Sequence, residues 1–81
     1  MLDWNDLRYF LAVARSGSTL AASRKLGVSQ ATVSRRISVL EEALDVALFI
    51  RNPAGYSLTL RGQAMLPEAE AVEDAVEALI G

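Results

Sequence analysis

Apolar and polar positions alternate most regularly between residues 29 and 44. Four apolar side chains recur there at i, i+4, i+7 and i+11, which places them along one line of an α-helix. They are Val33, Ile37, Leu40 and Leu44. Ser29 precedes this stripe as a candidate N-cap, because its hydroxyl can accept a hydrogen bond from an unpaired amide of the first turn. The pattern predicts a core-facing helix over residues 30–44.

Two shorter patterns come earlier in the chain. The first has apolar residues at i, i+3, i+4 and i+7, namely Leu7, Phe10, Leu11 and Ala14. It predicts a helix that starts at Asn5 or Asp6, with Asn5 as its cap and Trp4 as the N′ member of a hydrophobic staple against Tyr9. The second pattern predicts a shorter helix between residues 18 and 26.

Residues 18–44 together predict a helix-turn-helix. Ser18 is a candidate N-cap of the shorter helix, and Leu20 and Leu26 supply its inner face. Gly27 suits the position after that helix, where a positive φ is common. A short helix, a turn that contains glycine and a longer helix form this motif.

The pattern changes to a strand-like one after the long helix. Asp45 is expected in a left-handed conformation at the helix end, which Asp tolerates better than most residues. Two β-prone runs, 48–51 and 56–59, then flank Asn52-Pro53-Ala54-Gly55 and predict a hairpin. A hairpin in this place is the wing of a winged helix.

The last segment returns to a helical pattern. Thr59 is a plausible cap, and Pro67 should kink the helix or delay its start. Apolar residues follow at heptad spacing: Met65, Ala69, Val72, Val76 and Leu79. The acids of this helix have no bases beside them in the sequence, which favours pairing with a partner helix. The alternative is that the helix folds back on its own domain.

These elements predict a mainly α fold, a winged helix-turn-helix with three helices and a two-stranded wing. The expected division is a domain at residues 1–59 and a linker or dimerisation helix at residues 60–81. The predicted core is apolar and comprises Leu7, Phe10, Leu11, Ala14, Leu20, Ala22, Leu26, Val33, Ile37, Leu40, Leu44, Leu48 and Leu58.

Composition narrows the class of protein. A chain of 81 residues that is 52% hydrophobic and 22% charged is a folded domain rather than a disordered tail. It has no cysteine and no histidine, so disulfides, thiol nucleophiles, imidazole bases and the usual metal sites are excluded, and no cofactor is expected. The longest apolar run, Tyr9 to Ala14, is far below the ~18 residues of a membrane span. The acidic N-terminus does not resemble a signal peptide, and a cytoplasmic location is expected.

Charge divides the chain in two. Residues 1–62 hold all eight bases against five acids, a balance of +3, whereas residues 63–81 hold five acids and no base, a balance of −5. Binding responds to charge within about 8–10 Å, so the total of −2 does not exclude an anionic partner for the basic part. A head with a charge of only +3 should bind weakly unless two heads act together.

The outer face of residues 30–44 carries small, hydroxyl, amide and guanidinium side chains. Small side chains let a helix approach another surface closely, and Gln30 and Arg35 can form the bidentate hydrogen bonds that distinguish adenine and guanine. This combination favours a recognition helix for DNA over an ordinary solvated surface.

The motifs resemble the DNA-binding domain of LysR-type transcriptional regulators. The similarity runs from Leu7 to Leu60 through Leu-x-x-Phe-Leu-Ala-Val-Ala, Gly-Ser-x-x-Ala-Ala, Val-Ser-Gln-x-x-Val-Ser-Arg-x-Ile, Leu-Glu, Leu-Phe-x-Arg and Leu-Thr. The chain differs from the family pattern at Asp45, where glycine is common, and at Ala31, where proline is frequent.

The resemblance implies a bacterial transcription regulator that binds double-stranded DNA. Expected base contacts are Gln30, Ala31, Ser34 and Arg35. Expected backbone contacts are Ser18, Ser29, Thr32, Arg36, Arg51 and Asn52. For Arg51 the phosphate contact is favoured, and the alternative is a solvated arginine at the end of a strand.

The resemblance also implies a homodimer formed through the last helix. The seam Met65, Ala69, Val72, Val76 and Leu79 would pair two subunits on an interrupted palindrome, with the helices antiparallel so that their acids are offset. A small-molecule effector is expected only if a ligand-sensing domain exists outside this chain.

Two other classes of function compete with DNA binding. A winged helix can serve as a protein–protein interaction module, which the negative total charge would suit, although the third helix lacks the apolar or acidic patch that such modules need. An enzyme would need a nucleophile paired with an oriented base, or a glycine-rich phosphate loop, and the sequence contains neither.

Overall fold

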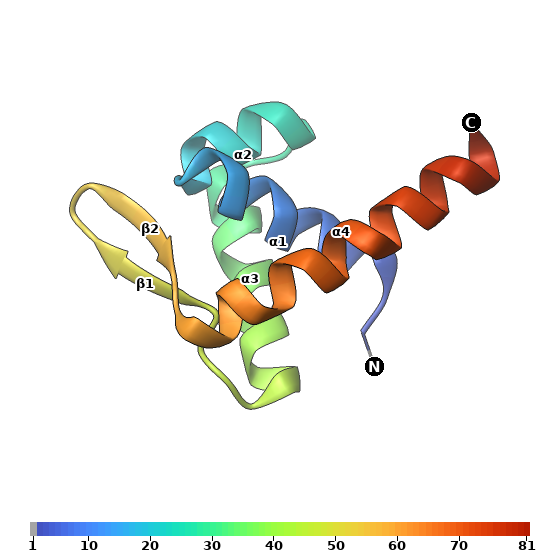
Figure 1. Ribbon diagram of the computed structural model, residues 1–81. Coiled ribbons are helices and arrows are strands. Elements are labelled where there is room, and N and C mark those ends of the chain that lie inside the picture. Colours follow the sequence, from blue (N-terminus) through green and yellow to red (C-terminus); the bar gives the residue numbers. More distant parts are fainter. Residues whose placement is uncertain (1) are drawn as a thin grey trace.

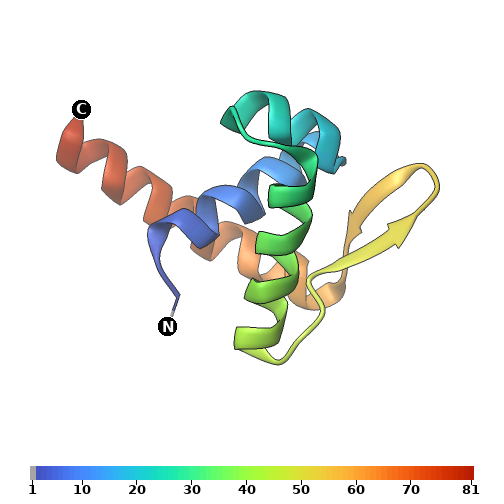
Figure 2. The same ribbon diagram turned by 180° about the vertical axis from the view of Figure 1, so that it is seen from behind.

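The computed structural model describes residues 2–81 and forms four helices and a two-stranded sheet in that range (Figure 1). The elements are α1 (Trp4–Ser16), α2 (Thr19–Leu26), α3 (Gln30–Leu44), β1 (Phe49–Asn52), β2 (Gly55–Leu58) and α4 (Leu60–Ile80). The predicted order of three helices, a hairpin and a long helix is confirmed. The hairpin projects on one side of the helices, and the C-terminal end of α4 projects on the other (Figures 1 and 2).

Helix α1 begins earlier than the sequence predicted. Asp3 is the N-cap, and it forms a reciprocal capping box in which each Asp3 and Asp6 carboxylate accepts a hydrogen bond from the other residue's amide at 3.1 Å. This box satisfies two amides that a cap at Asn5 would leave unpaired. The expected Asn5 cap is therefore wrong. Trp4 is the first residue of the helix rather than a residue before the cap, and it packs against the core from there.

Helix α1 is also more deeply buried than a single stripe implies. Beyond the predicted Leu7, Phe10 and Leu11, it buries Tyr9, Ala12 and Val13. The helix packs against α2, α3 and α4, so that only a narrow strip of its surface is left for solvent. A template with one apolar face cannot anticipate a helix that is enclosed from several sides.

The predicted caps of the helix-turn-helix are confirmed. The hydroxyls of Ser18 and Ser29 each accept a hydrogen bond from a backbone amide of the following helix. Gly27 adopts a left-handed φ of 71° after α2, and Asp45 adopts a left-handed φ of 55° after α3. The cap residues therefore fix where α2 and α3 begin and end.

Most of the predicted core is confirmed, with two errors. Eight predicted residues are buried: Leu7, Phe10, Leu11, Ala22, Val33, Ile37, Leu40 and Leu48. Ala14, Leu26 and Leu58 are partly buried against them. Leu20 and Leu44 are 45% and 36% exposed, so their assignment to the core is wrong. Leu20 lies off the buried face of α2, which carries Thr19, Ala22 and Ser23. Leu44 is the last residue of α3 and lines an open cleft.

The wing is an antiparallel pair in which Phe49 pairs with Leu58 and Asn52 pairs with Gly55. Its strands are shifted by one residue from the expected runs, 48–51 and 56–59. Phe49 anchors the wing, because its ring is buried with its centroid 5.5 Å from that of Phe10 and 5.8 Å from that of Tyr56. The base of the wing is thus part of the core, whereas the side chains at its tip are exposed.

Helix α4 begins at Leu60, directly after the predicted Thr59 cap, and continues through Pro67. The expectation that Pro67 would delay the helix start is wrong, because the start is fixed upstream. The Thr59 hydroxyl accepts a hydrogen bond from the Gly62 amide at 3.0 Å. Gly62 is packed so closely that a Cβ there would overlap the carbonyl oxygen of Leu48. The helix and the base of the wing are therefore held together.

The first half of α4 packs on the domain, and the second half leaves it. Met65 and Ala69 lie against the core, and Ala69 is only 2% exposed. Leu79, by contrast, is 84% exposed, and Figure 1 shows this end of α4 extending away from the other elements. The first half of α4 thus folds back on its own domain, which was one of the two alternatives, and pairing of the second half with a partner helix stays a prediction. No helix of the described residues has the length and apolarity to cross a membrane.

Candidate nucleic-acid interface

Helix α3 has two chemically different faces. Val33, Ile37 and Leu40 are buried against the rest of the domain. On the outer face Gln30, Ala31 and Arg35 are exposed and Ser34 is half-buried. The stripe that faces the core thus leaves the four predicted base-contact residues at or near the surface of the N-terminal half of α3. Figure 2 shows α3 lying at the surface of the domain, beside the wing.

The four predicted base-contact residues differ in how they are held. The Gln30 side chain is fixed, because its Nε2 donates a hydrogen bond to Thr19 Oγ1 at 2.9 Å. Arg35 forms no ion pair or side-chain hydrogen bond within residues 2–81, so its guanidinium is available to a ligand. Ala31 and Ser34 have small side chains, which allow another surface to approach this part of the helix backbone closely.

The hydroxyl groups predicted to contact the DNA backbone are occupied as helix caps. Ser18 Oγ accepts a hydrogen bond from the Ala21 amide at 2.9 Å. Ser29 Oγ accepts from the Thr32 amide at 3.1 Å and donates to Thr32 Oγ1 at 2.9 Å. These caps mark the N-termini of α2 and α3, where free backbone amides and the positive end of the helix dipole favour an anion.

Arg36 lies on the flank of α3 that faces α1. Its guanidinium carbon is 5.6 Å from the centroid of the Tyr9 ring, a cation–π arrangement with an exposed cation. The stacking limits the directions in which the guanidinium points without neutralising its charge. Arg36 can therefore still contact a phosphate, but from the side of α3 and not from its outer face.

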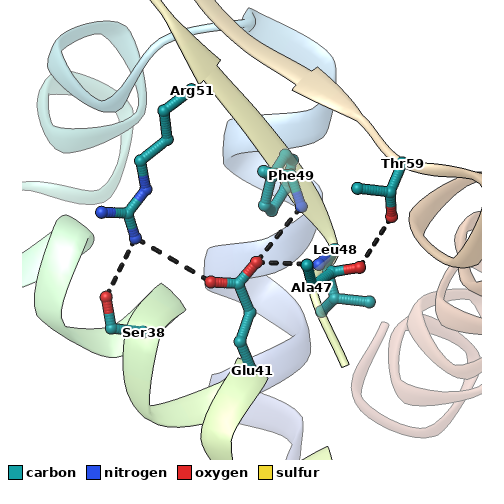
Figure 3. A network of polar contacts seen from close by, with 7 residues as sticks. All are labelled: Ser38, Glu41, Ala47, Leu48, Phe49, Arg51 and Thr59. Atoms are coloured by element: carbon teal, nitrogen blue, oxygen red, sulfur yellow. Dashed lines mark hydrogen bonds and ion pairs between the residues drawn. The ribbon is translucent and has the colours of Figure 1, made fainter. Parts of the chain in front are cut away.

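The sequence did not single out Glu41, which connects the wing to α3 (Figure 3). Its Oε2 accepts hydrogen bonds from the amides of Leu48 at 2.8 Å and Phe49 at 3.2 Å. Its Oε1 lies 3.9 Å from an Nη of Arg51. One carboxylate thus joins the recognition helix to the first residues of the wing. The signal in the sequence was an acid on α3 close to the non-helical segment that follows this helix. The backbone amides of such a segment have no acceptor within a helix and need one elsewhere.

Arg51 is held between the wing and α3. The same Nη donates to Ser38 Oγ at 3.0 Å (Figure 3). The guanidinium carbon also lies 5.5 Å from the centroid of the Tyr56 ring. The residue is nevertheless exposed. The alternative of a freely solvated arginine at the end of a strand does not describe these contacts. Asn52 next to it uses its Oδ1 to accept from the Ala54 amide at 3.1 Å, which leaves its NH₂ group to donate elsewhere.

Arg15 is paired with the acids of α4, which corrects the expectation that these acids have no base beside them. Its two terminal nitrogens contact Glu73 at 2.9 and 2.6 Å, and Glu70 lies 3.5 Å away. The hydrogen bonds from Arg15 lower the pKa of Glu73, and the same bonds raise the pKa of Arg15. The pair attaches α4 to α1 and removes Arg15 from the set of cations that are free for a polyanion. Sequence position could not show this, because 58 residues separate the partners.

Other features of the described residues are less specific. The carboxylates of Glu73, Asp74 and Glu77 lie close enough together to share a metal ion, but exposed acids on a helix commonly do so without one. An open cleft of about 450 Å³ lies between α1, α3 and α4. It is mainly apolar, and Leu44, Val46, Met65 and Val72 are among the residues that line it.

Comparisons with known proteins identify the family. Residues 4–63, well over half of the chain, match the model of the bacterial regulatory helix-turn-helix protein, lysR family. The chain belongs to this family. Residues 4–63 are therefore a LysR-type winged helix-turn-helix domain, as the sequence motifs implied, and the regulator family is one of transcription factors and not of enzymes.

Individual relatives agree with this assignment. HTH-type transcriptional regulator ClcR of Pseudomonas putida is 43% identical over 68 residues, which are 84% of this chain and 23% of that protein. This chain thus spans about a quarter of the length of such a relative. A crystal structure of the CbnR DNA-binding domain with DNA is similar with a TM-score of 0.90 and 35% identity, covering 95% of this chain and 88% of that one. A complex of the BenM DNA-binding domain with benA site 1 DNA has a TM-score of 0.92 and 30% identity, covering 98% and 89%.

Proposed function

We propose that this chain binds double-stranded DNA in a sequence-specific way, as the DNA-binding domain of a LysR-type transcriptional regulator. The observation that carries the proposal is the outer face of α3, where Gln30 and Arg35 are exposed beside small residues and two capped helix N-termini. Helix 30–44 enters the major groove, and wing residues 49–59 contact the backbone or the minor groove. The similarity to two domains solved in complex with DNA supports this arrangement over a protein–protein module.

Within this proposal the base contacts come from four residues. Arg35 donates two hydrogen bonds to guanine O6 and N7, and Gln30 pairs with the N6 and N7 edge of adenine. Ala31 lies against a thymine methyl group, and Ser34 completes the contact surface. All four lie in the first six residues of α3, so the N-terminal half of the helix determines sequence preference.

The backbone contacts surround this face. Ser18, Ser29 and Thr32 mark the N-termini of α2 and α3, where amides and helix dipoles attract phosphates. Arg36 on the flank of α3 and Arg51 with Asn52 in the wing supply further phosphate contacts. Because Glu41 and Ser38 join Arg51 to α3, a phosphate held by the wing fixes the position of the recognition helix on the duplex.

The proposal includes a homodimer formed through α4, with a seam of Met65, Ala69, Val72, Val76 and Leu79. The C-terminal part of this seam has the most free surface, since Leu79 is 84% exposed and Val72 is also exposed. Met65 borders the apolar cleft between α1, α3 and α4, so a partner helix could cover both the seam and the exposed Leu44. Ala69 packs within the single chain, whatever it contributes to a dimer.

Dimerisation would give the domain its useful affinity. Two α3 helices at a fixed spacing would match an interrupted palindrome with half-sites about 34 Å, or a multiple of this, apart. An antiparallel pair of α4 helices offsets the acids that a parallel pair would oppose. With Arg15 paired to Glu73, each head presents even less positive charge than its sequence suggests, and coupling two weak heads compensates for this.

The remaining parts of the proposal follow from the family. We propose residues 1–59 as the DNA-binding domain and residues 60–81 as the linker and dimerisation helix. The protein acts in the cytoplasm, where bacterial DNA lies, and has no catalytic role, cofactor or metal. It responds to a small-molecule effector only through a further domain outside this chain.

The salt dependence of DNA binding tests the proposal. Fluorescence anisotropy with a labelled random duplex should show binding at low salt that weakens steeply at moderate salt, since each neutralised phosphate contributes roughly 0.9 to the slope of log K against log salt. A duplex that carries a site selected from a randomised library should bind more tightly under the same conditions. Absence of binding to either duplex at low salt would exclude DNA as the partner.

A further inference from the structure

The Gln30 side chain is oriented before any ligand is bound. Its Nε2 donates to Thr19 Oγ1 at 2.9 Å, across the turn between the two helices of the helix-turn-helix. Gln30 and Thr19 are the first residues of α3 and α2, so each has a backbone fixed by its cap, Ser29 and Ser18 respectively. Thr19 is 5% exposed, so its hydroxyl is held in place by the packing of α2.

This hydrogen bond determines which groups Gln30 presents outward. A glutamine amide has two N–H donors and one carbonyl acceptor. With one N–H directed at Thr19, the second N–H and Oε1 remain for a ligand. Adenine presents the complementary pair in the major groove, an acceptor at N7 and a donor at N6. Guanine presents two acceptors, so an amide whose Oε1 is directed at the base edge cannot satisfy both of them.

We propose that Thr19 is a positioning residue that sets the base preference of Gln30, selecting adenine by holding the amide in one orientation. The inference rests on the proposed function, because it assumes that Gln30 contacts a base. Thr19 itself touches no DNA in this arrangement. It acts by holding the Gln30 side chain, in the protein without DNA, in one rotamer with Oε1 and Nε2 in fixed positions.

The size of the effect follows from the cost of ordering a side chain. Immobilising a flexible side chain on binding reduces affinity by roughly 2- to 10-fold. The Thr19 hydrogen bond already orders the Gln30 side chain in the free protein, so binding does not have to. The benefit arises only where the ordered amide finds its matching base, since an amide that contacts no base need not be ordered. Loss of the bond should therefore lower discrimination between bases more than it lowers affinity for random DNA.

The test uses four variants of the chain: T19V, T19S, Q30A and the double variant T19V/Q30A. Valine has nearly the shape of threonine but no hydroxyl, whereas serine keeps the hydroxyl and loses only the methyl group. A randomised duplex library first defines the site selected by the parent. Affinities for that site and for single-base variants of it are then measured, together with thermal unfolding of each protein.

The proposal expects Q30A to remove the preference for adenine at one position of each half-site. T19V should lower the preference at that same position by roughly 2- to 10-fold, at nearly unchanged unfolding temperature and affinity for random DNA. T19S should restore most of it, and T19V should have no further effect when Q30A is already present.

The outcomes that overturn the proposal are distinct from those that overturn DNA binding. A parent that selects no sequence refutes sequence-specific binding and this inference with it. A parent site that Q30A leaves unchanged refutes base contact by Gln30. If Q30A removes the adenine preference but T19V keeps it, or if T19V weakens every base equally, Thr19 does not position Gln30.

Discussion

Helices α3 and α4 both carry an apolar stripe in the sequence, but the two stripes differ in how far the fold buries them. Along α3, Val33, Ile37 and Leu40 are all buried by the same chain. Along α4, the exposed fraction of the side chain rises from 2% at Ala69 to 84% at Leu79. The spacing of apolar residues is equally good in both helices. Periodicity therefore identifies an apolar face, and the length of the helix relative to its neighbours decides how much of that face the same chain covers.

The outer faces of the two helices differ in charge in a corresponding way. The outer face of α3 presents Gln30 and Arg35, which suit a polyanion, while α4 presents carboxylates, which repel one. The two regions are joined at Arg15, whose contacts with Glu70 and Glu73 hold the acidic helix against α1. The molecule thus separates a surface that suits a polyanion from an acidic helix whose C-terminal apolar residues are exposed.

The largest expected effect comes from the covered stripe. Ile37→Ala should destabilise the domain by roughly 2–5 kcal/mol, because it opens a cavity at a fully buried position of α3. For a domain of this size that is much of the total stability. Thermal or urea unfolding measures it. Leu79→Ala is the matched control on the exposed stripe of α4 and should change stability little. If both variants unfold like the parent, or if both are equally destabilised, the two stripes do not differ in their contribution to stability.

The next effect separates the two stripes by function. Val72→Asp together with Val76→Asp should give a folded monomer and reduce binding to a duplex with two half-sites by about a hundredfold, because the second head no longer binds as part of the same molecule. Binding to a single half-site should change little. Sedimentation gives the oligomeric state, and circular dichroism checks the fold. A parent that sediments as a monomer at high micromolar concentration would contradict dimerisation through α4.

A smaller effect distinguishes the outer face of α3 from the wing. Arg35→Ala should cost about 1–3 kcal/mol on the preferred sequence and relax preference at one base position. Arg51→Ala should weaken specific and random DNA by similar factors and lower the salt slope by about one phosphate. Competition binding with both duplexes separates the cases. Equal loss on both duplexes for Arg35→Ala would place Arg35 among the phosphate contacts.

The smallest effect tests the attachment of α4 to α1. Glu73→Gln should lower stability near neutral pH by less than about 1 kcal/mol, since Arg15 and Glu73 are partly exposed. The pKa of Glu73 is lowered in the folded protein, so the contribution is present above the pKa of the unfolded chain and is lost as pH falls through the folded pKa. Unfolding curves of parent and variant should therefore differ at about pH 7 and converge as the pH falls through the lowered pKa of Glu73. Glu77→Gln, a nearby acid of α4, is the control, and an equal shift for both variants would show a general effect of charge.

The sequence alone determined the elements of this protein and the family to which it belongs. Caps and periodicity are local properties, so Ser18, Gly27, Ser29, Asp45 and Thr59 could each be assigned from near neighbours, and the structure confirms all five. The motif spacing was enough to imply the LysR-type domain, which the family comparison confirms. The base, backbone and dimer contacts stay predictions, because they depend on partners that the chain does not contain.

Only the tertiary structure decided which side chains meet across the fold. Glu41 with the Leu48 and Phe49 amides, Arg15 with Glu73, and Gln30 with Thr19 join residues from different elements. Local patterns carry no information about such pairs, because the angles between helices bring them together. The same reason explains the errors at Leu20 and Leu44. The packing of α2 buries Thr19, Ala22 and Ser23 and leaves Leu20 exposed, and Leu44 ends α3 beside an open cleft.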